Sequence, residues 1–202
     1  MLFLRKIYFL KTFRPGAHTA ILLATLLFSV NYWVAKGLMP GYFDPLQIIF
    51  FRVAGASVLF WLLTYSIKEI RSVKIEKSDR MKIILLALLG VAANQIFFFT
   101  GLNYSKPVDT SIINATNPVF VLLLGAVIFG EKITFRRMSG IILGLCGALM
   151  LVIFNGNNDQ GVHFSTGNLL IVMNTFCYSL YLVYARPVFI KYNPIVVMKY
   201  VF

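Results

Sequence analysis

Acidic residues are scarce in this sequence, since only seven of its 202 residues are Asp or Glu, against 19 that are Lys or Arg. Cysteine is scarcer, and Cys146 and Cys177 both lie within apolar runs, where reduced thiols behave as small apolar residues. We therefore expect no disulfide. The sequence also lacks a Ser-His-Asp grouping, a phosphate-binding glycine loop and a cluster of metal ligands. These absences argue against an enzyme and against a metal or cofactor site.

The formal net charge of +12 would by itself suit a protein that binds nucleic acid. The placement of the charges argues against this, because they lie between apolar runs and their density alternates along the chain. The chain is 59% hydrophobic, with a mean hydropathy of +0.80, well above the average for a soluble domain. The sequence therefore predicts an integral membrane protein whose partner is the lipid bilayer and not nucleic acid.

We predict an all-α, polytopic transmembrane helical bundle with six full spans and the start of a seventh, since a span needs about 20 apolar residues. The spans are expected at 17–35, 46–67, 83–104, 108–130, 138–154, 167–185 and from 195 onward. The last run stops at Phe202 after eight residues, and so short a helix reaches only about 12 Å. We therefore expect a truncated or fragmentary chain, whose missing part begins by completing this span.

Lys and Arg residues concentrate in alternate connections between the spans. The N-terminal segment and the connections after the second, fourth and sixth spans hold fifteen of them, whereas the other three connections hold only Lys36 and Lys106. Cytoplasmic connections are enriched in basic residues. We therefore expect residues 1–16 to form a basic cytoplasmic segment of a multi-pass protein in the cytoplasmic (inner) membrane.

Two segments at an offset of 149 residues are weakly alike. Tyr32 and Pro45 correspond to Tyr181 and Pro194, so that in each copy a span containing a Tyr leads to a Pro that opens the next span. The first copy starts on the inside and the second on the outside. Inverted repeats of this kind are typical of secondary transporters.

Several stretches together resemble the EamA-like members of the drug/metabolite transporter (DMT) superfamily, in order and spacing, over nearly the whole chain from Ala17. They are Phe28 to Lys36, Asp44-Pro45-Leu46 with Phe51-Arg52, Gly101 to Ser105, Pro118 with Gly130 to Thr134, Gly140 with Gly144 and Gly147, and Phe176 to Tyr181. The resemblance implies a five-plus-five inverted-repeat fold, truncated here in its second half. Residues 17–154 would form the first five-helix repeat and residues 155–202 the incomplete second one.

The resemblance implies a permease that transports small organic metabolites by alternating access, mainly outward and without a cofactor. Amino acids and related compounds are one candidate class of small-molecule substrate. No carboxylate lies at mid-membrane depth to carry a proton, which favours passive uniport or coupling through the missing half. A non-transporting receptor or scaffold and an inactive fragment of a ten-helix transporter are the alternatives, whereas an intramembrane enzyme would need paired catalytic groups that are absent.

Polar residues inside the spans are candidates for lining a cavity, because polar groups are costly in hydrocarbon. The predicted substrate-binding residues are Trp33, Asn94, Gln95, Asn114, Asn117, Asn174, Tyr178 and Arg52. Each polar stripe has an alternative role in hydrogen bonding between helices. Pro118 lies near the centre of the fourth span, where it removes a backbone donor and predicts a kink.

Arg52 lies seven residues after Pro45, which places it about 10 Å into the membrane from the outer side. A guanidinium at that depth needs a partner or water. It would either anchor an anionic group, such as a carboxylate, or snorkel to the surface or cap a neighbouring helix. Snorkelling is slightly favoured, because the distance is within reach of an arginine.

The fifth predicted span has a face of small residues at Gly140, Gly144 and Ala148. Small residues at this spacing allow two helix backbones to approach closely. We expect this face to pack within the bundle, and a homodimer formed through it is the alternative.

Overall fold

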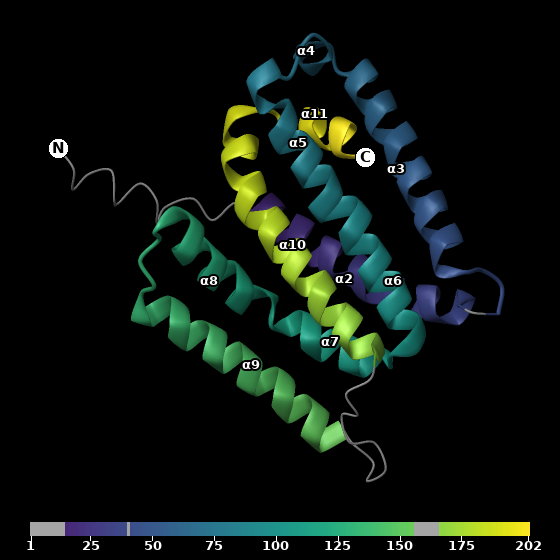
Figure 1. Ribbon diagram of the computed structural model, residues 1–202, viewed down its shortest axis with the longest axis vertical. Coiled ribbons are helices and arrows are strands. Elements are labelled where there is room, and N and C mark those ends of the chain that lie inside the picture. Colours follow the sequence, from purple (N-terminus) through teal and green to yellow (C-terminus); the bar gives the residue numbers. More distant parts are fainter. Residues whose placement is uncertain (1–14, 40, 156–165) are drawn as a thin grey trace.

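The computed structural model describes residues 15–39, 41–155 and 166–202, and within this part every regular element is a helix, as Figure 1 shows. The predicted all-α helical bundle is therefore confirmed. The helices are α2 (Pro15–Leu38), α3 (Pro45–Ser66), α4 (Lys68–Arg71), η2 (Lys77–Asp79), α5 (Arg80–Ala87), η3 (Leu88–Ala93), α6 (Asn94–Tyr104), α7 (Pro107–Ala115), α8 (Asn117–Phe129), α9 (Phe135–Asn155), α10 (Thr166–Lys191) and α11 (Pro194–Val201).

Among the described residues, five helical stretches are long and apolar enough to cross a membrane. They are His18–Leu38, Pro45–Ser66, Lys77–Tyr104, Pro107–Phe129 and Thr166–Lys191. These stretches coincide with five of the predicted spans, while α9 covers the predicted span at 138–154 and α11 the start of the seventh. Several side chains of α9 fall outside the described part, so the total of six full spans stays a prediction.

Two of the five stretches are interrupted near their middle. The stretch Lys77–Tyr104 contains the π-helical segment η3 between α5 and α6. The stretch Pro107–Phe129 is divided at Thr116, where α7 ends and α8 begins, and Pro118 stands at the start of α8. Proline has no backbone N–H to continue the helix, and π-helical turns displace the backbone ladder. Both breaks fall beside the polar residues that the sequence singles out.

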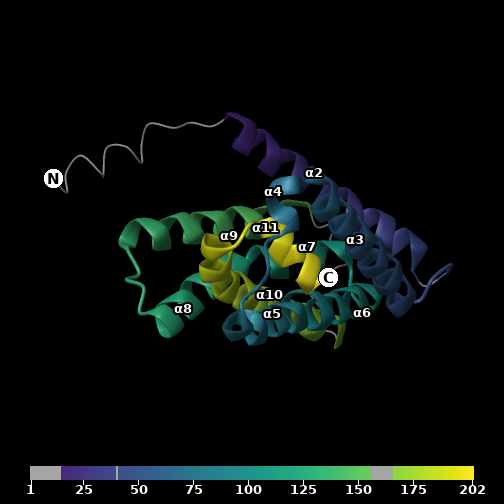
Figure 2. The same ribbon diagram turned by 90° about the horizontal axis from the view of Figure 1, so that it is seen from above.

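The long helix α10 is the central element of the bundle and packs against α5, α6, α7 and α8. In Figure 1 it crosses the molecule diagonally, and its buried positions run from Gly167 to Val188. The helices α8 and α9 lie at the opposite end of the molecule from α3 in both ribbon views (Figures 1 and 2). By contrast, α2 and α3 expose most of their apolar side chains, as expected of helices that face lipid.

The predicted outer end is held together where α10 begins against the end of α6. A Cβ atom on Gly167 would lie 2.7 Å from the carbonyl carbon of Tyr104 and 2.8 Å from the amide nitrogen of Ser105, so only glycine fits there. The Ser105 hydroxyl also donates a hydrogen bond to the Asn168 side chain. These contacts fix the start of α10 directly on the α6 backbone.

Lys36, near the end of α2, closes the same region from the other side. Its Nζ donates hydrogen bonds to the carbonyl oxygens of Leu102 at 2.7 Å, Asn103 at 2.9 Å and Ser105 at 3.0 Å. The last carbonyls of a helix have no partner within that helix and attract a cation. Lys36 therefore ties α2 to the end of α6.

The small-residue face of α9 is not packed against the bundle at the two glycines that can be assessed. A Cβ atom on Gly140 or Gly144 would meet no atom within 4 Å, whereas the side chain of Ala148 lies outside the described residues. The expectation that these glycines pack within the bundle is therefore wrong for this chain. The homodimer alternative stays a prediction.

Candidate functional site

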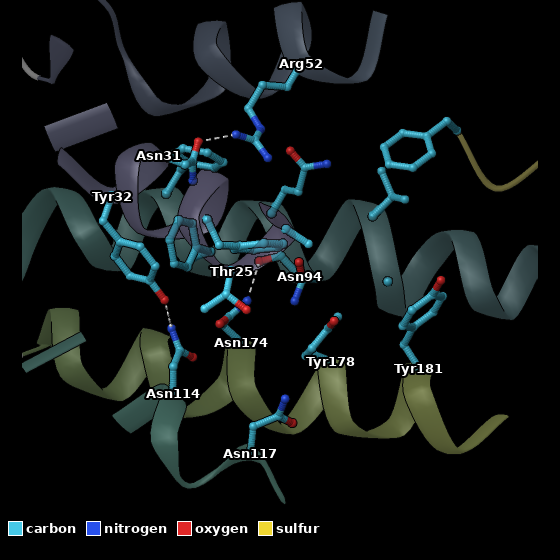
Figure 3. Close-up of a pocket in the computed structure, with 18 of the residues that line it drawn as sticks. Thr25, Asn31, Tyr32, Arg52, Asn94, Asn114, Asn117, Asn174, Tyr178 and Tyr181 are labelled. Atoms are coloured by element: carbon cyan, nitrogen blue, oxygen red, sulfur yellow. Dashed lines mark hydrogen bonds between the residues drawn. The ribbon is translucent and has the colours of Figure 1, made fainter. Parts of the chain in front are cut away.

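A cavity of about 1020 Å³ lies between helices that are far apart in the sequence (Figure 3). Its wall is built by α2, α3, the η3–α6 stretch, the α7–α8 break, α10 and α11. Aromatic and aliphatic side chains form much of the wall. Its polar members are Thr25, Asn31, Tyr32, Arg52, Asn94, Gln95, Asn114, Asn117, Asn174, Tyr178 and Tyr181.

The structure brings seven of the eight predicted substrate-binding residues to this one cavity. They are Asn94, Gln95, Asn114, Asn117, Asn174, Tyr178 and Arg52, and Pro118 lies on the same wall. Trp33 is the exception, because its side chain is 74% exposed and borders a separate, smaller hollow beside Ser29 and Pro107.

The geometry of α2 explains why Trp33 lies elsewhere. The predicted stripe ran through Thr25, Ser29 and Trp33, but eight helical residues end about 80° away from the starting direction, whereas seven end within about 20° of it. The cavity face of α2 accordingly follows Thr25, Phe28 and Tyr32. The structure also brings in Asn31, whose isolated amide within a span was a signal that the sequence-based selection passed over.

Asn114 connects three helices at one side of the cavity. Its Nδ2 donates a hydrogen bond to the hydroxyl oxygen of Tyr32 in α2 at 2.7 Å. Its Oδ1 accepts a hydrogen bond from the Thr175 hydroxyl in α10 at 2.8 Å. Figure 3 shows Asn114 at the end of α7 facing Tyr32 across the cavity wall. Both hydrogen-bonding ends of the amide are thus used between helices.

The two asparagines beside the helix breaks make similar bonds to α10. Ser179 donates a hydrogen bond to Oδ1 of Asn117 at 2.6 Å. Asn174 donates its Nδ2 to the backbone carbonyl of Asn94 at 2.9 Å, directly after the π-helical segment. Cavity lining and bonding between helices, the two roles considered for these amides, therefore occur together.

Gln95 differs from the other amides of the wall. It is mostly buried, it lines the cavity, and its Oε1 accepts no hydrogen bond from any described residue. An unsatisfied acceptor in a buried place costs free energy unless water or a solute supplies a donor. This oxygen is therefore available to a solute with an N–H or O–H group.

Arg52 is the one charged side chain on the cavity wall among the described residues. Its Nη1 donates a hydrogen bond to the Asn31 side chain, and its guanidinium lies over the ring of Phe99, with Cζ 5.1 Å from the ring centroid. Figure 3 shows Arg52 reaching from α3 toward Asn31 and the cavity. The side chain is thus engaged by α2 and α6 and is not directed to the membrane surface, contrary to the snorkelling interpretation.

Ionic contacts cluster at the other end of α10. Asp79 accepts hydrogen bonds from Lys82 at 2.7 Å, from Lys191 at 2.7 Å and from the Tyr192 hydroxyl at 2.9 Å. Lys191 also donates to a carboxylate oxygen of Glu76 at 2.7 Å. Charged pairs that also share hydrogen bonds are stronger than simple contacts between ions. The cluster ties the end of α10 to the start of α5.

A second ionic contact links α10 to the end of α8. Glu131 pairs with Arg186 of α10, and Arg137 of α9 approaches the same carboxylate at 3.4 Å. Both ionic groups lie in connections that the charge pattern assigns to the cytoplasm. The wall of the cavity is therefore held by amides near its middle and by ions at this end.

Comparison with known proteins identifies the family. Residues 16–153 match the model of the EamA-like transporter family. The chain belongs to the EamA-like transporter family. This agrees with the resemblance seen in the sequence. The division at residue 154 into a first and a second repeat stays a prediction.

The chain is similar to curated EamA-like relatives over about half of their length. It is 28% identical over 148 residues to the uncharacterized transporter YyaM of Bacillus subtilis, covering 72% of this chain and 48% of that protein. It is 27% identical over 154 residues to an uncharacterized transporter of Archaeoglobus fulgidus, covering 76% and 52%. A WAT1-related protein of Arabidopsis thaliana is 36% identical over 81 residues, covering 37% and 22%.

The fold is also similar to that of a protein of known crystal structure. The TM-score is 0.64 at 19% sequence identity, covering 92% of this chain and 63% of the other. At this identity the likeness supports the arrangement of the helices alone.

Proposed function

We propose that this EamA-like chain is the cavity-forming part of a transporter that moves small organic metabolites across the cytoplasmic membrane by alternating access. The single observation that supports this most is the cavity of about 1020 Å³ with amides from α6, α7, α8 and α10 on its wall. Binding sites for small molecules usually have volumes of about 300–1,000 Å³. Polar groups gathered at membrane depth are characteristic of solute pathways.

The hydrogen bonds around the cavity supply a mechanism for this function. Three of them, Asn114–Thr175, Asn117–Ser179 and Asn174–Asn94, join α10 to the helices of the predicted first repeat. Transporters with inverted repeats alternate by rocking one repeat against the other around a midplane site. A polar solute that replaces some of these bonds would lower the cost of separating α10 from α6, α7 and α8.

The proposal includes outward movement and a cytoplasmic N-terminus, for which the uneven placement of Lys and Arg is the support. The topology can be tested in spheroplasts with a cysteine-free background. Cysteines placed at Lys74 and Lys106 should react with a membrane-impermeant maleimide only at position 106. Labelling of position 74 in intact spheroplasts would reverse the proposed orientation.

Transport itself is tested by counterflow with the full-length protein in liposomes. Vesicles loaded with a mixture of unlabelled amino acids and carboxylic acids should accumulate a labelled member of that mixture, and empty vesicles should not. The receptor or scaffold alternative predicts binding of a solute without accumulation. Absence of counterflow for every solute, with binding retained, would therefore replace the transporter proposal by that alternative.

A further inference from the structure

We infer that Arg52, Asn31 and Phe99 form an anion-binding subsite within the cavity, and that the transported solute carries one carboxylate on an apolar body. This inference rests on the proposed function, because it takes the cavity as the substrate site. It goes further by giving the solute a charge and by naming the residue that selects it.

The first argument is charge balance. Arg52 is the one ionic side chain on the cavity wall, and none of the ion pairs found among the described residues includes it. Arg186, in contrast, is paired with Glu131 at the other end of the bundle. An isolated cation at membrane depth is costly and is found where it meets a counter-ion or water. A carboxylate in the cavity would supply the missing negative charge.

The second argument is the geometry of the guanidinium. Arginine has five N–H donors in one plane, and Arg52 gives one of its hydrogen bonds to Asn31. Phe99 holds the guanidinium through its ring face, 5.1 Å from the centroid to Cζ, and so leaves the donors at the rim of the plane unused. A carboxylate can accept two parallel hydrogen bonds from such a rim. Asn31 and Phe99 thus orient Arg52 without neutralising it.

The third argument concerns the rest of the solute. The cavity wall near these residues is largely aromatic and aliphatic, with Phe28, Phe60, Phe98 and Met198 among its members. Such a wall accommodates an apolar body by burying its surface. It offers no carboxylate that would bind an organic cation, because no acidic residue lines the cavity in the part of the chain that the structure describes. A solute with a single anionic end and an apolar body matches both features.

The subsite can be tested by binding measurements on the full-length protein in maltoside micelles, which contain no phosphate. The probes are 3-phenylpropionate, its neutral amide and 3-phenylpropylamine, which share one body and differ in charge. We expect the carboxylate to bind about tenfold or more tightly than the amide, and the amine not to bind. Arg52→Gln should remove that tenfold preference while leaving the affinity for the amide within about threefold.

A matched control is Lys199→Gln, because Lys199 also lies over an aromatic ring, 4.0 Å from the centroid of Trp61, but does not line the cavity. This variant should keep the preference for the carboxylate. Arg52→Lys should keep part of the preference and shows that a loss in Arg52→Gln is not due to unfolding. An equal affinity of the wild-type protein for carboxylate and amide would overturn the inference while leaving the cavity as a binding site.

Two further outcomes distinguish a solute carboxylate from a lipid headgroup and from a cavity that binds no solute. If none of the three probes binds and no counterflow is found, the proposed function itself fails. A lipid phosphate has the same charge as a carboxylate, so the measurement is repeated with added phosphatidylglycerol. Binding of that lipid to Arg52, with no binding of 3-phenylpropionate at any lipid level, would assign the subsite to a headgroup and overturn the inference.

Discussion

Tyr32 and Thr175 lie on different helices, yet both form hydrogen bonds to the side chain of Asn114. The amide nitrogen reaches the Tyr32 hydroxyl at 2.7 Å, and the amide oxygen receives the Thr175 hydroxyl at 2.8 Å. Asn114 is the last residue but one of α7, directly before the break at Thr116. The bridge therefore joins α2 and α10 at the point where the fourth predicted span changes direction.

Replacing Asn114 with leucine should abolish this bridge and reduce transport. Leucine is similar in volume but can make neither hydrogen bond, so Tyr32 and Thr175 lose their shared partner. We expect flux in the full-length protein to fall about tenfold or more, with normal insertion into the membrane. Ser111→Ala is the matched control, because the Ser111 hydroxyl bonds only to Val108 of its own helix. Equal flux in both variants would argue against a role for Asn114 in the cavity.

The sequence was sufficient to predict the helical bundle and most of the cavity wall. Apolar runs of span length locate α2, α3, α6, α8 and α10, since the bilayer imposes a minimum length on each crossing helix. Amides inside those runs have few places to go, because hydrocarbon cannot satisfy them. This physical restriction explains why Asn94, Asn114, Asn117 and Asn174 share one cavity.

The sequence could not give the exact helix faces or the local departures from α-helical geometry. Trp33 was selected by a spacing of eight residues, which drifts away from the cavity, whereas Tyr32 at a spacing of seven stays on it. The π-helical segment at Leu88–Ala93 has no proline to announce it. It depends on packing against α10, where Gly90 leaves room for Tyr181. Such features follow from tertiary contacts that periodicity does not encode.

Asp79 offers a test of the ionic cluster at the end of α10. Asp79→Asn removes the charge that Lys82 and Lys191 share, so it should lower the melting temperature of the purified protein. Lys191→Gln should have a similar effect, and the double variant should lose less than the sum of the two, because both act on one interaction. Glu69→Gln, an exposed carboxylate of α4, serves as control and should leave the melting temperature unchanged. Fully additive losses would show that the two residues act independently.

The contact between Gly90 and Tyr181 predicts a conditional effect. A Cβ atom on Gly90 would lie 2.7 Å from Cγ of the Tyr181 ring, so Gly90→Ala should destabilise the protein by about 1–3 kcal/mol. In a Tyr181→Ala background the ring is gone, and the same substitution should become neutral or slightly stabilising. Unfolding in a graded denaturant series measures all four proteins of this cycle. A loss that persists without the Tyr181 ring would assign the effect to the π-helical backbone and not to the ring.

The junction of α6 and α10 predicts an order among three glycines. A Cβ atom on Gly167 would collide with backbone atoms of Tyr104 and Ser105, which cannot move independently. One on Gly101 would meet chiefly the flexible end of Ile171, at 2.7 Å from Cδ1, and one on Gly55 would meet nothing within 4 Å.

Alanine at position 167 should therefore cost about 3 kcal/mol or more, and alanine at position 101 should cost less because the Ile171 side chain can rotate. Alanine at position 55 should be neutral or stabilise the helix by up to about 1 kcal/mol, since glycine is a poor helix former. Melting temperatures of the three single variants, each measured in the same detergent, establish the order. If the variant at position 101 proved the least stable, α10 would be fixed on α6 by the Ile171 side chain, and the backbone contact at Gly167 would be secondary.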